Sequence, residues 1–404
     1  MSREKLGMPL NRVYETNREA VLQYIHSHNP VSQKDIANTV GLKQPTVSKI
    51  VRELINANII EKKVLAEEKR SKGRPPEYLK ITSKLLALAI RVARNKIISA
   101  YVDIDGNVYE RTDHPLPSQR GANELINLLE KIIKNHQDEF SGQQGTLIGF
   151  GMAVPGPVNL KKGKIAKVTG RSDWSGLNLT KLENITELPF LIRHDAAAAA
   201  IGENLFGTTK GSSNNIFIAA GRGVGAGIIT NGELVQGSQG YSGEFGHMSI
   251  EANGVECPCG NRGCIESYAS INSLLRNLKG KLEESKSSYP FDELTFDSVV
   301  KQVKDSKEVN EAVKEAGYYL GVGIANLVNL FGPEIIVLGD EMVKLGDIWV
   351  DKVKKVIKER SLTQYCESLN IITSDLNDNF FLKGAGALAV EKFLRNSKVW
   401  LKNE

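Results

Sequence analysis

One histidine and three of the chain's four cysteines lie close together in the second half of the sequence. They are His247, Cys257, Cys259 and Cys264. Closed tetrahedral zinc sites hold thiolate sulfur at about 2.3 Å and imidazole nitrogen at about 2.0–2.1 Å from the metal. Four such ligands leave no position for a catalytic water. The spacing therefore predicts a structural zinc ion that shapes a site rather than attacking a substrate.

The alternative is that these cysteines are ordinary buried thiols or a disulfide pair. Residues 1–12 are polar and charged and do not resemble a signal peptide. We therefore expect a cytoplasmic protein, in which stable disulfides are rare. This expectation favours zinc. Cys366 stands alone in the sequence and is expected to be a small, partly buried apolar residue.

The length and charge of the chain indicate two functional parts. A chain of 404 residues is expected to fold as two or three domains. It has no run of about 18 uncharged apolar residues, which argues against a membrane-spanning helix. Residues 1–80 hold fifteen Lys or Arg and nine Asp or Glu, a net charge of +6, so the remainder carries −1. Positive charge on one small segment is typical of a part that binds phosphate.

Three helical patterns precede residue 57. The first runs from residue 18 to Asn29-Pro30, and the second runs from 32 to 40 with Ser32 as N-cap. The third begins near residue 44 and carries an apolar stripe with helical spacing, at Val47, Ile50, Val51 and Leu54. Two helices around a glycine turn predict a helix-turn-helix, although any small helical bundle can show such a stripe.

The outer residues of the third helix suit the major groove of DNA, because Gln can bond adenine edges and Lys can reach guanine or phosphate. We expect contacts from Lys43, Gln44, Pro45, Thr46, Ser48 and Lys49.

Two predicted short strands, 59–64 and 78–81, flank a charged loop as in a wing. Its tip offers Arg70, Lys72, Gly73 and Arg74 to a narrow minor groove. The alternative is a plain basic linker. We predict a winged helix-turn-helix over residues 1–82 that binds operator DNA as a homodimer or homotetramer, because one recognition helix contacts few bases.

After residue 82 the sequence indicates an α/β architecture with two similar lobes and a cleft between them. Three strands, with a hairpin turn at 105–107, precede a helix and a fourth strand, and this order repeats approximately from Ile216. A last helix is expected to pack back on the first lobe. The predicted strands are 86–92, 97–104, 108–111, 147–154 and 334–338. The predicted helices are 123–136, 309–330 and a last one that follows residues 384–387 and runs to about 394.

Three further segments carry a resemblance to a known family. They are 149–158, which reads GFGMAVPGPV, 195–203, which reads DAAAAAIGE, and 243–247, which reads GEFGH and leads into the cysteine cluster. Together they resemble the ROK family of sugar kinases and sugar-responsive repressors, and the winged helix resembles its repressor branch. The resemblance implies an actin-like, two-lobed hexokinase-type fold over 83–404. Lobe one is expected at about 83–205 plus 384–404, and lobe two at about 206–383.

The resemblance also implies a sugar site in the cleft. Asp195, Glu244, His247 and Glu266 are expected to face sugar hydroxyls, with one ring nitrogen of His247 on zinc and the other on the ligand. Asp195 also suits the positive end of a helix.

Two other positions depart from asparagines that are common in the family, namely His194 and Arg171. Because arginine only donates hydrogen bonds, Arg171 indicates either a phosphorylated or acidic sugar or a hinge salt bridge.

Three nucleotide elements of the family's kinases are altered. The kinases end their first strand with Asp-x-Gly-Gly-Thr, whereas residues 90–96 here read IRVARNK. Arg222 stands where the kinases usually have threonine, and Asp340 replaces the second glycine of a Gly-Gly pair. We therefore predict a repressor without enzymatic activity that sugar releases from its operator. An ATP-dependent sugar kinase is the alternative, and an activator role or a protein partner stays open.

Overall fold

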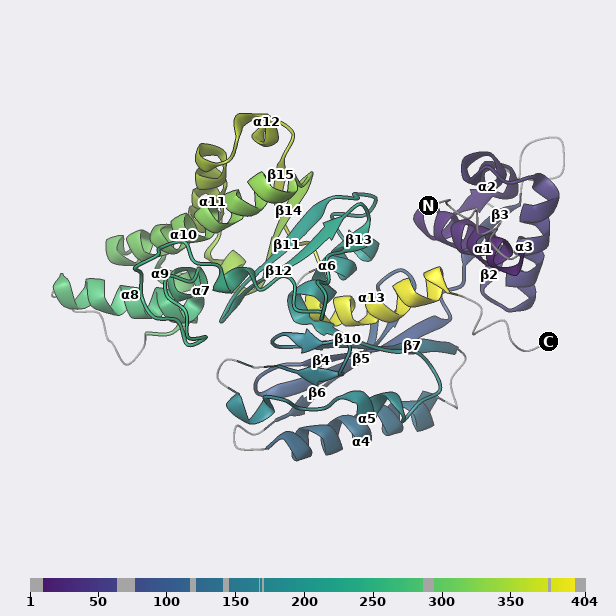
Figure 1. Cartoon of the computed structure of the whole chain (residues 1–404), viewed down its shortest axis with the longest axis horizontal. Coiled ribbons are helices and arrows are strands. Elements are labelled where there is room, and N and C mark those ends of the chain that lie inside the picture. The colour runs from purple at the N-terminus through teal and green to yellow at the C-terminus, as the bar shows by residue number, and fades with distance from the viewer. Residues whose placement is uncertain are drawn as a thin grey trace, which may run out of the picture.

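The computed structural model describes residues 10–63, 77–116, 121–140, 145–166, 168, 171–285, 294–376 and 379–396. The predicted DNA contacts Arg70, Lys72, Gly73 and Arg74 lie outside these ranges. Figure 1 shows a small purple N-terminal part beside two larger lobes, each built on a sheet.

The N-terminal part is a winged helix-turn-helix. Its three-stranded sheet has the order β1-β3-β2, and the predicted apolar stripe of the third helix is fully buried. Ser32 accepts a hydrogen bond from the Asp35 N–H, and Gly41 ends the second helix with φ of 70°. The elements are α1 (Leu10–Ser27), β1 (Val31–Ser32), α2 (Gln33–Val40), α3 (Gln44–Asn56), β2 (Ile60–Lys63) and β3 (Tyr78–Ile81).

The sheet of lobe one has the order β10-β7-β4-β5-β6. Helix α4 (Ala122–Phe140) covers one face and α13 (Phe380–Arg395) the other. The strands are β4 (Leu85–Val92), β5 (Lys96–Asp103), β6 (Val108–Pro115), β7 (Thr146–Val154) and β10 (Phe190–His194). Strand β6 extends four residues past its predicted end because β5 pairs with it as far as Lys96 opposite Pro115.

Lobe two repeats this topology, with the order β13-β12-β11-β14-β15 and the same antiparallel and parallel pairings. The predicted repeat from Ile216 is therefore confirmed. Its strands are β11 (Asn215–Ala220), β12 (Val224–Thr230), β13 (Glu233–Leu234), β14 (Ile335–Gly339) and β15 (Asn370–Thr373). The helices packed on its outer face include α8 (Ile271–Glu284), α10 (Lys307–Phe331) and α11 (Asp347–Arg360).

Two helices lie back to back between the sheets. Helix α6 (Asp195–Phe206) packs on the sheet of lobe two, and α13 packs on the sheet of lobe one, as predicted for the last helix. They meet through small residues, because a Cβ added at Gly384 would lie 2.5 Å from the Ala198 backbone. Helix α13 begins at Phe380 and includes residues 384–387, which were predicted to precede it, since Phe380 and Phe381 are buried against lobe two and extend its apolar face.

The winged helix shares its apolar core with lobe one. Val21, Leu22 and Ile25 of α1 belong to the same buried cluster as Phe393 and Leu394 of α13. No helix among the described residues is long and apolar enough to cross a membrane.

Candidate metal centre and ligand cleft

The histidine and three cysteines converge as the sequence predicts. Their ligand atoms all lie within 4.8 Å of one another. The Sγ atoms of Cys259 and Cys264 are 3.7 Å apart, and His247 Nδ1 is 3.7 Å from Cys257 Sγ. Tetrahedral zinc with bonds of about 2.3 Å to sulfur and 2.0–2.1 Å to nitrogen separates its ligands by roughly 3.6–3.8 Å. The four residues therefore fit zinc, with Nδ1 on the metal side and Nε2 left for another partner.

Tight turns bring the cysteines together. The Cys257 N–H donates to Asn261 O, the Gly260 N–H donates to Cys257 O, and Gly260 has φ of 101°. Residues 249–262 are mostly exposed and have no apolar core of their own. A bound metal would therefore supply much of the stability of this segment.

The protonation of the thiols also suits a metal. Burial and hydrogen bonding to its neighbours raise the pKa of the Cys264 thiol to about 12. For Cys259, burial acts in the same direction, but hydrogen bonds, first to the Asn261 backbone, outweigh it and lower the pKa. Adjacent thiolates repel one another, whereas a bound cation deprotonates coordinating thiols outright. A cation bound at this point would therefore stabilise the charged form of these thiols.

Five predicted ligand-facing residues gather beside this centre. Burial raises the pKa of the Glu244 carboxyl, His194 and His247 lower it, and Asp195 and Glu266 raise it further. Such charge effects act at short range, so the structure brings the five together. His194 Nε2 lies 3.0 Å from Asp195 Oδ1, and the Val224 N–H donates to Glu266 Oε2 at 2.9 Å.

Two polar atoms of this group are buried without a hydrogen-bond partner among the described residues, namely Glu244 Oε1 and His194 Nδ1. Buried polar atoms are nearly always paired, because an unpaired one costs about 1–3 kcal/mol. The acceptor and the ring nitrogen therefore point to a polar ligand.

Local glycines position these side chains. The segment 243–247 lies against β12, where a Cβ at Gly243 or Gly246 would fall within 2.2 Å of a β12 carbonyl oxygen. A Cβ added at Gly223 would lie 3.1 Å from the Glu266 carboxylate, and one added at Gly225 would lie 3.2 Å from the His194 ring. The glycines at 223 and 225 thus make room for the side chains of Glu266 and His194.

Two of the altered nucleotide elements, the glycine turn at 221 and Asp340, lie against each other. A Cβ at Gly221 would lie 2.3 Å from Asp340 Oδ2, and Asp340 has φ of 73° and ψ of −174°, a region essentially restricted to glycine. Burial raises the pKa of Asp340 to about 7, and the positive charge of Arg91 opposes this shift. Arg91 lies 4.1 Å above the Phe381 ring. A buried carboxylate therefore lies directly against the glycine turn at 221.

Arg171 has partners away from the Glu244 group. Its Nε and Nη2 donate to Asp173 at 3.0 and 2.8 Å, its Nη1 donates to Arg94 O at 3.0 Å, and it stacks on Trp174. These contacts favour the salt-bridge alternative over a charged ligand. They also hold the turn between β4 and β5, where the kinases have their first phosphate loop.

The N-terminal tip of α3 is exposed at Lys43, Gln44 and Pro45. The Ser48 hydroxyl donates to Gln33 Oε1 at 2.9 Å, and Thr46 is half-buried. Lys49 lies 4.9 Å above the Tyr14 ring. Of the six predicted contacts, four are therefore exposed and two, Thr46 and Ser48, are partly buried.

Sequence reasoning missed Arg52, which is exposed on α3. Its position eight residues after Gln44 and four after Ser48 places it on the same face, a signal that the sequence already contained.

Comparisons with known proteins identify both parts. Residues 87–392 match the ROK family, and residues 17–72 match the MarR family. The chain is 30% identical over 392 residues to a xylose repressor of Bacillus spizizenii, covering 95% of this chain and 97% of the relative. It is 27% identical over 384 residues to the DNA-binding transcriptional repressor Mlc of Escherichia coli, covering 93% of each.

Comparison with solved structures supports the same family assignment. A ROK family transcriptional regulator, a homologue of Escherichia coli Mlc, superposes with a TM-score of 0.83 at 26% identity, covering 95% of this chain and 97% of that one. A ROK family glucokinase from Streptomyces griseus shares the fold, with a TM-score of 0.65 at 24% identity, and covers 76% of this chain and 99% of its own. The chain thus belongs to the ROK family and carries a winged helix domain of the MarR type at its N-terminus.

Proposed function

We propose that this protein is a DNA-binding transcriptional repressor of carbohydrate-utilisation genes, which leaves its operator when a sugar binds between the lobes. Residues 1–82 form the DNA-binding domain, and residues 83–404 form the sugar-binding domain with the two lobes expected from the sequence. The observation that carries the sugar site is the pair of unpartnered buried atoms, Glu244 Oε1 and His194 Nδ1, beside a four-ligand metal cluster. The repressor names of the relatives support the assignment.

The ligand-facing set is Glu244, His247, Asp195, Glu266 and His194. Carboxylate oxygens accept hydrogen bonds from sugar hydroxyls, and the histidine rings can donate or accept. When bound, zinc would fix the tautomer and direction of the His247 ring. We leave Arg171 out, because its donor nitrogens already bind Asp173 and the Arg94 carbonyl.

Loss of phosphoryl transfer follows from the nucleotide elements. A phosphate-binding turn needs backbone amides that a triphosphate can approach closely. The Asp340 carboxylate instead lies close to the glycine turn at 221, and the charge of Arg91 acts on that carboxylate. We infer that a sugar is sensed and not phosphorylated.

The exposed residues Lys43, Gln44 and Pro45 lead the recognition helix into the major groove, with Thr46, Ser48 and Lys49 behind them. Arg52 lies further along the same face. Arg70, Lys72, Gly73 and Arg74 of the wing complete the contact in the minor groove. We propose a homodimer or homotetramer, since paired half-sites require paired recognition helices.

A melting-temperature panel of monosaccharides and their phosphates tests the sugar assignment. D-xylose is the first probe, because it appears in the names of the relatives. A ligand that binds only the folded protein raises its melting temperature. Glu244→Gln keeps the size of the side chain but removes the charged acceptor and should abolish the shift. A panel without any shift, or an equal shift in Glu244→Gln, would contradict the site.

Operator release is measured next, on a duplex selected from a random library by the full-length protein. The sugar that raises the melting temperature most should weaken binding of that duplex. An ATP-coupled assay with the same sugar should give no turnover above background, and turnover would support the kinase alternative.

A further inference from the structure

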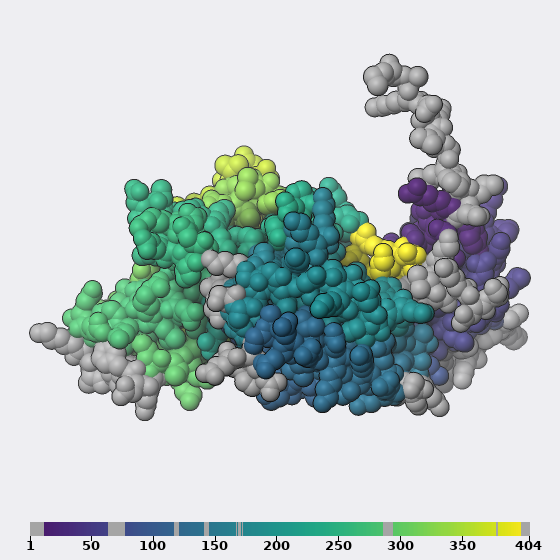
Figure 2. Space-filling model, turned by 60° about the horizontal axis from the view of Figure 1, so that its bottom comes forward, coloured from purple at the N-terminus to yellow at the C-terminus, as the bar shows by residue number. Residues whose placement is uncertain are grey.

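The winged helix is attached to lobe one through an apolar core that also contacts Leu205 and Phe206 at the end of α6. Its helix α1 shares a core with the end of α13, and His26 Nε2 lies 3.0 Å from the Ile104 carbonyl oxygen of lobe one. Figure 2 shows the yellow end of α13 between the teal atoms and the purple domain. Motion of lobe one should therefore carry the DNA-binding domain with it.

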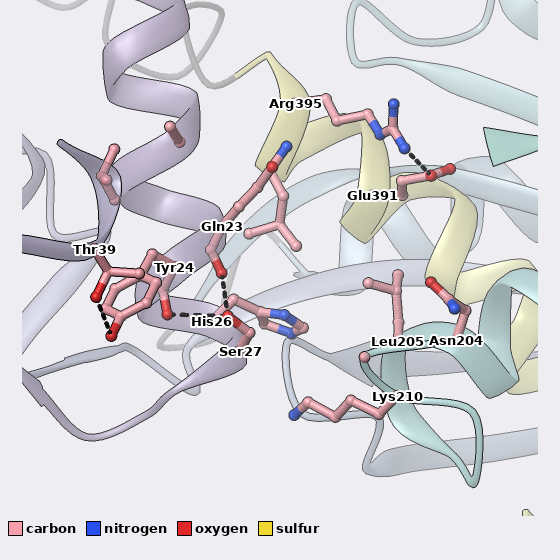
Figure 3. Close-up of a pocket in the computed structure, with 14 residues that line it drawn as sticks. Gln23, Tyr24, His26, Ser27, Thr39, Asn204, Leu205, Lys210, Glu391 and Arg395 are labelled. Carbon is pink, nitrogen blue, oxygen red and sulfur yellow. Dashed lines mark hydrogen bonds and ion pairs between the residues drawn. The ribbon is translucent and has the colours of Figure 1, made fainter. Parts of the chain in front are cut away.

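A cavity of about 500 Å³ lies between the winged helix and the segment that enters lobe two. Figure 3 shows Gln23, Tyr24 and His26 of α1 on one side, and Asn204 and Lys210 on the other. Because this space is not packed, lobe two can shift relative to the winged helix without a clash.

Arg395 connects the end of α13 to lobe two at the edge of this cavity. Its Nη1 donates to Glu233 Oε1 at 2.5 Å, and its Nη2 donates to Gly232 O at 3.3 Å. Nη2 also lies 3.1 Å from Glu391 Oε1 in the previous turn of α13. The preceding residue, Leu394, is buried in the core shared with α1. The last turn of α13, which belongs to lobe one, therefore contacts both the winged helix and lobe two.

Strand β12 joins this contact to the proposed sugar site. At its first residue, the Val224 N–H donates to Glu266 Oε2, and Gly225 lies against the His194 ring. The strand ends at Thr230 and turns at Asn231-Gly232, both with positive φ, directly before Glu233. A seven-residue strand spans roughly 23 Å and is held by pairing with β11. A displacement at its first residue would therefore also move Glu233 and its contact with Arg395.

We propose that β12 and Arg395 relay the sugar-dependent movement of lobe two to the winged helix, with Arg395 as a positioning residue. The proposal rests on the proposed function and names the contact through which sugar changes operator binding. Sugar shifts the Glu266 and His194 end of β12, the hairpin moves with the strand, and Arg395 transmits the shift to the last turn of α13. The cavity leaves room for this motion.

Three single variants of the full-length protein test the relay. Glu233→Gln weakens the contact from lobe two and leaves α13 intact, Arg395→Gln weakens it from α13, and Lys355→Gln is the control. Lys355 forms an exposed ion pair with Glu359 on α11, away from the junction. The selected duplex is titrated with and without D-xylose, or with the panel sugar that gives the largest melting shift.

We expect both junction variants to keep the wild-type sugar-dependent melting shift. The factor by which sugar weakens duplex binding should fall by about two- to fivefold, the scale of an exposed ion pair. The double variant should match Arg395→Gln, because that change already removes the contact that Glu233→Gln weakens. Lys355→Gln should respond as wild type does.

The titrations distinguish a failure of the proposed function from a failure of the relay. If wild-type protein binds the duplex equally with and without every panel sugar, the proposed function fails. If the wild type responds and both Glu233→Gln and Arg395→Gln respond by the same factor, the relay is wrong and the proposed function stands. A variant that fails to fold is recognised by circular dichroism, and the other junction variant then decides.

Discussion

Asp340 offers a test of how the former nucleotide turn was remodelled, because charge and backbone strain can be separated there. Asp340→Asn removes the charge and retains a side chain in the same backbone conformation. Asp340→Gly removes the charge and also suits φ of 73° with ψ of −174°. We expect both variants to be more stable than the wild type at pH 8, and the glycine variant to be the more stable of the two.

The magnitude follows from the pKa of the carboxyl, which burial raises from 3.8 to about 7. A group with a raised pKa in the folded state contributes stability at low pH that is lost as the pH rises through the folded value. Three pKa units correspond to about 4 kcal/mol, an upper value for the gain of Asp340→Asn above pH 7. The gain should vanish below about pH 4. In Asp340→Gly, relief of backbone strain should stabilise the folded state further, by about 1–3 kcal/mol. The greater flexibility of glycine in the unfolded chain offsets about 0.5–1 kcal/mol of this gain.

The assay is the melting temperature of the wild type and both variants between pH 4 and pH 8. The Asn variant should separate from the wild type as the pH rises, and the Gly variant should exceed Asn by a margin that does not depend on pH. A wild type that is more stable than Asp340→Asn at pH 8 would refute the reasoning. The attraction of Arg91 for the charged carboxylate would then outweigh the cost of burying it.

Three other predictions concern the metal, the ligand and the DNA. Cys259→Ser should lower zinc affinity by at least about 100-fold and abolish the sugar-induced melting shift, as measured by zinc analysis and thermal melting, whereas Cys366→Ser should change neither. Glu266→Gln should leave zinc stoichiometry intact and weaken sugar binding by about tenfold or more in calorimetry, since it loses a charged acceptor; unchanged affinity would exclude this carboxylate. Gln44→Ala should weaken binding of the selected duplex by about five- to 150-fold at constant salt while sugar binding is kept, because a bidentate base contact contributes about 1–3 kcal/mol.

Much of the fold was predictable, because each pattern had a direct physical cause. The buried stripe of α3 and the cap at Ser32 defined the helix-turn-helix, and the repeated strand order defined two matching sheets. The ends of elements were harder. Strand β6 is lengthened by pairing with β5, and α13 by the burial of Phe380 and Phe381, both of which depend on distant parts of the chain.

The candidate site was predictable where residue type and spacing carried the chemistry. The four predicted metal ligands converge because short turns bring them together locally. Arg171 shows the limit of such reasoning. Its sequence position was compatible with either a charged ligand or a salt bridge, and only the spatial arrangement puts it on Asp173 and the Arg94 carbonyl. The Arg395 contact joins residues 162 positions apart, so no local pattern predicts it.

The most direct test of the account is a crystal structure of the full-length protein with the sugar selected by the melting panel, recorded at the zinc absorption edge. The account predicts one zinc ion bound by His247 Nδ1 and the three cysteine sulfurs, and a sugar whose hydroxyls contact His247 Nε2 and Glu244. A sugar bound elsewhere, or a cysteine cluster without anomalous density for zinc, would contradict it.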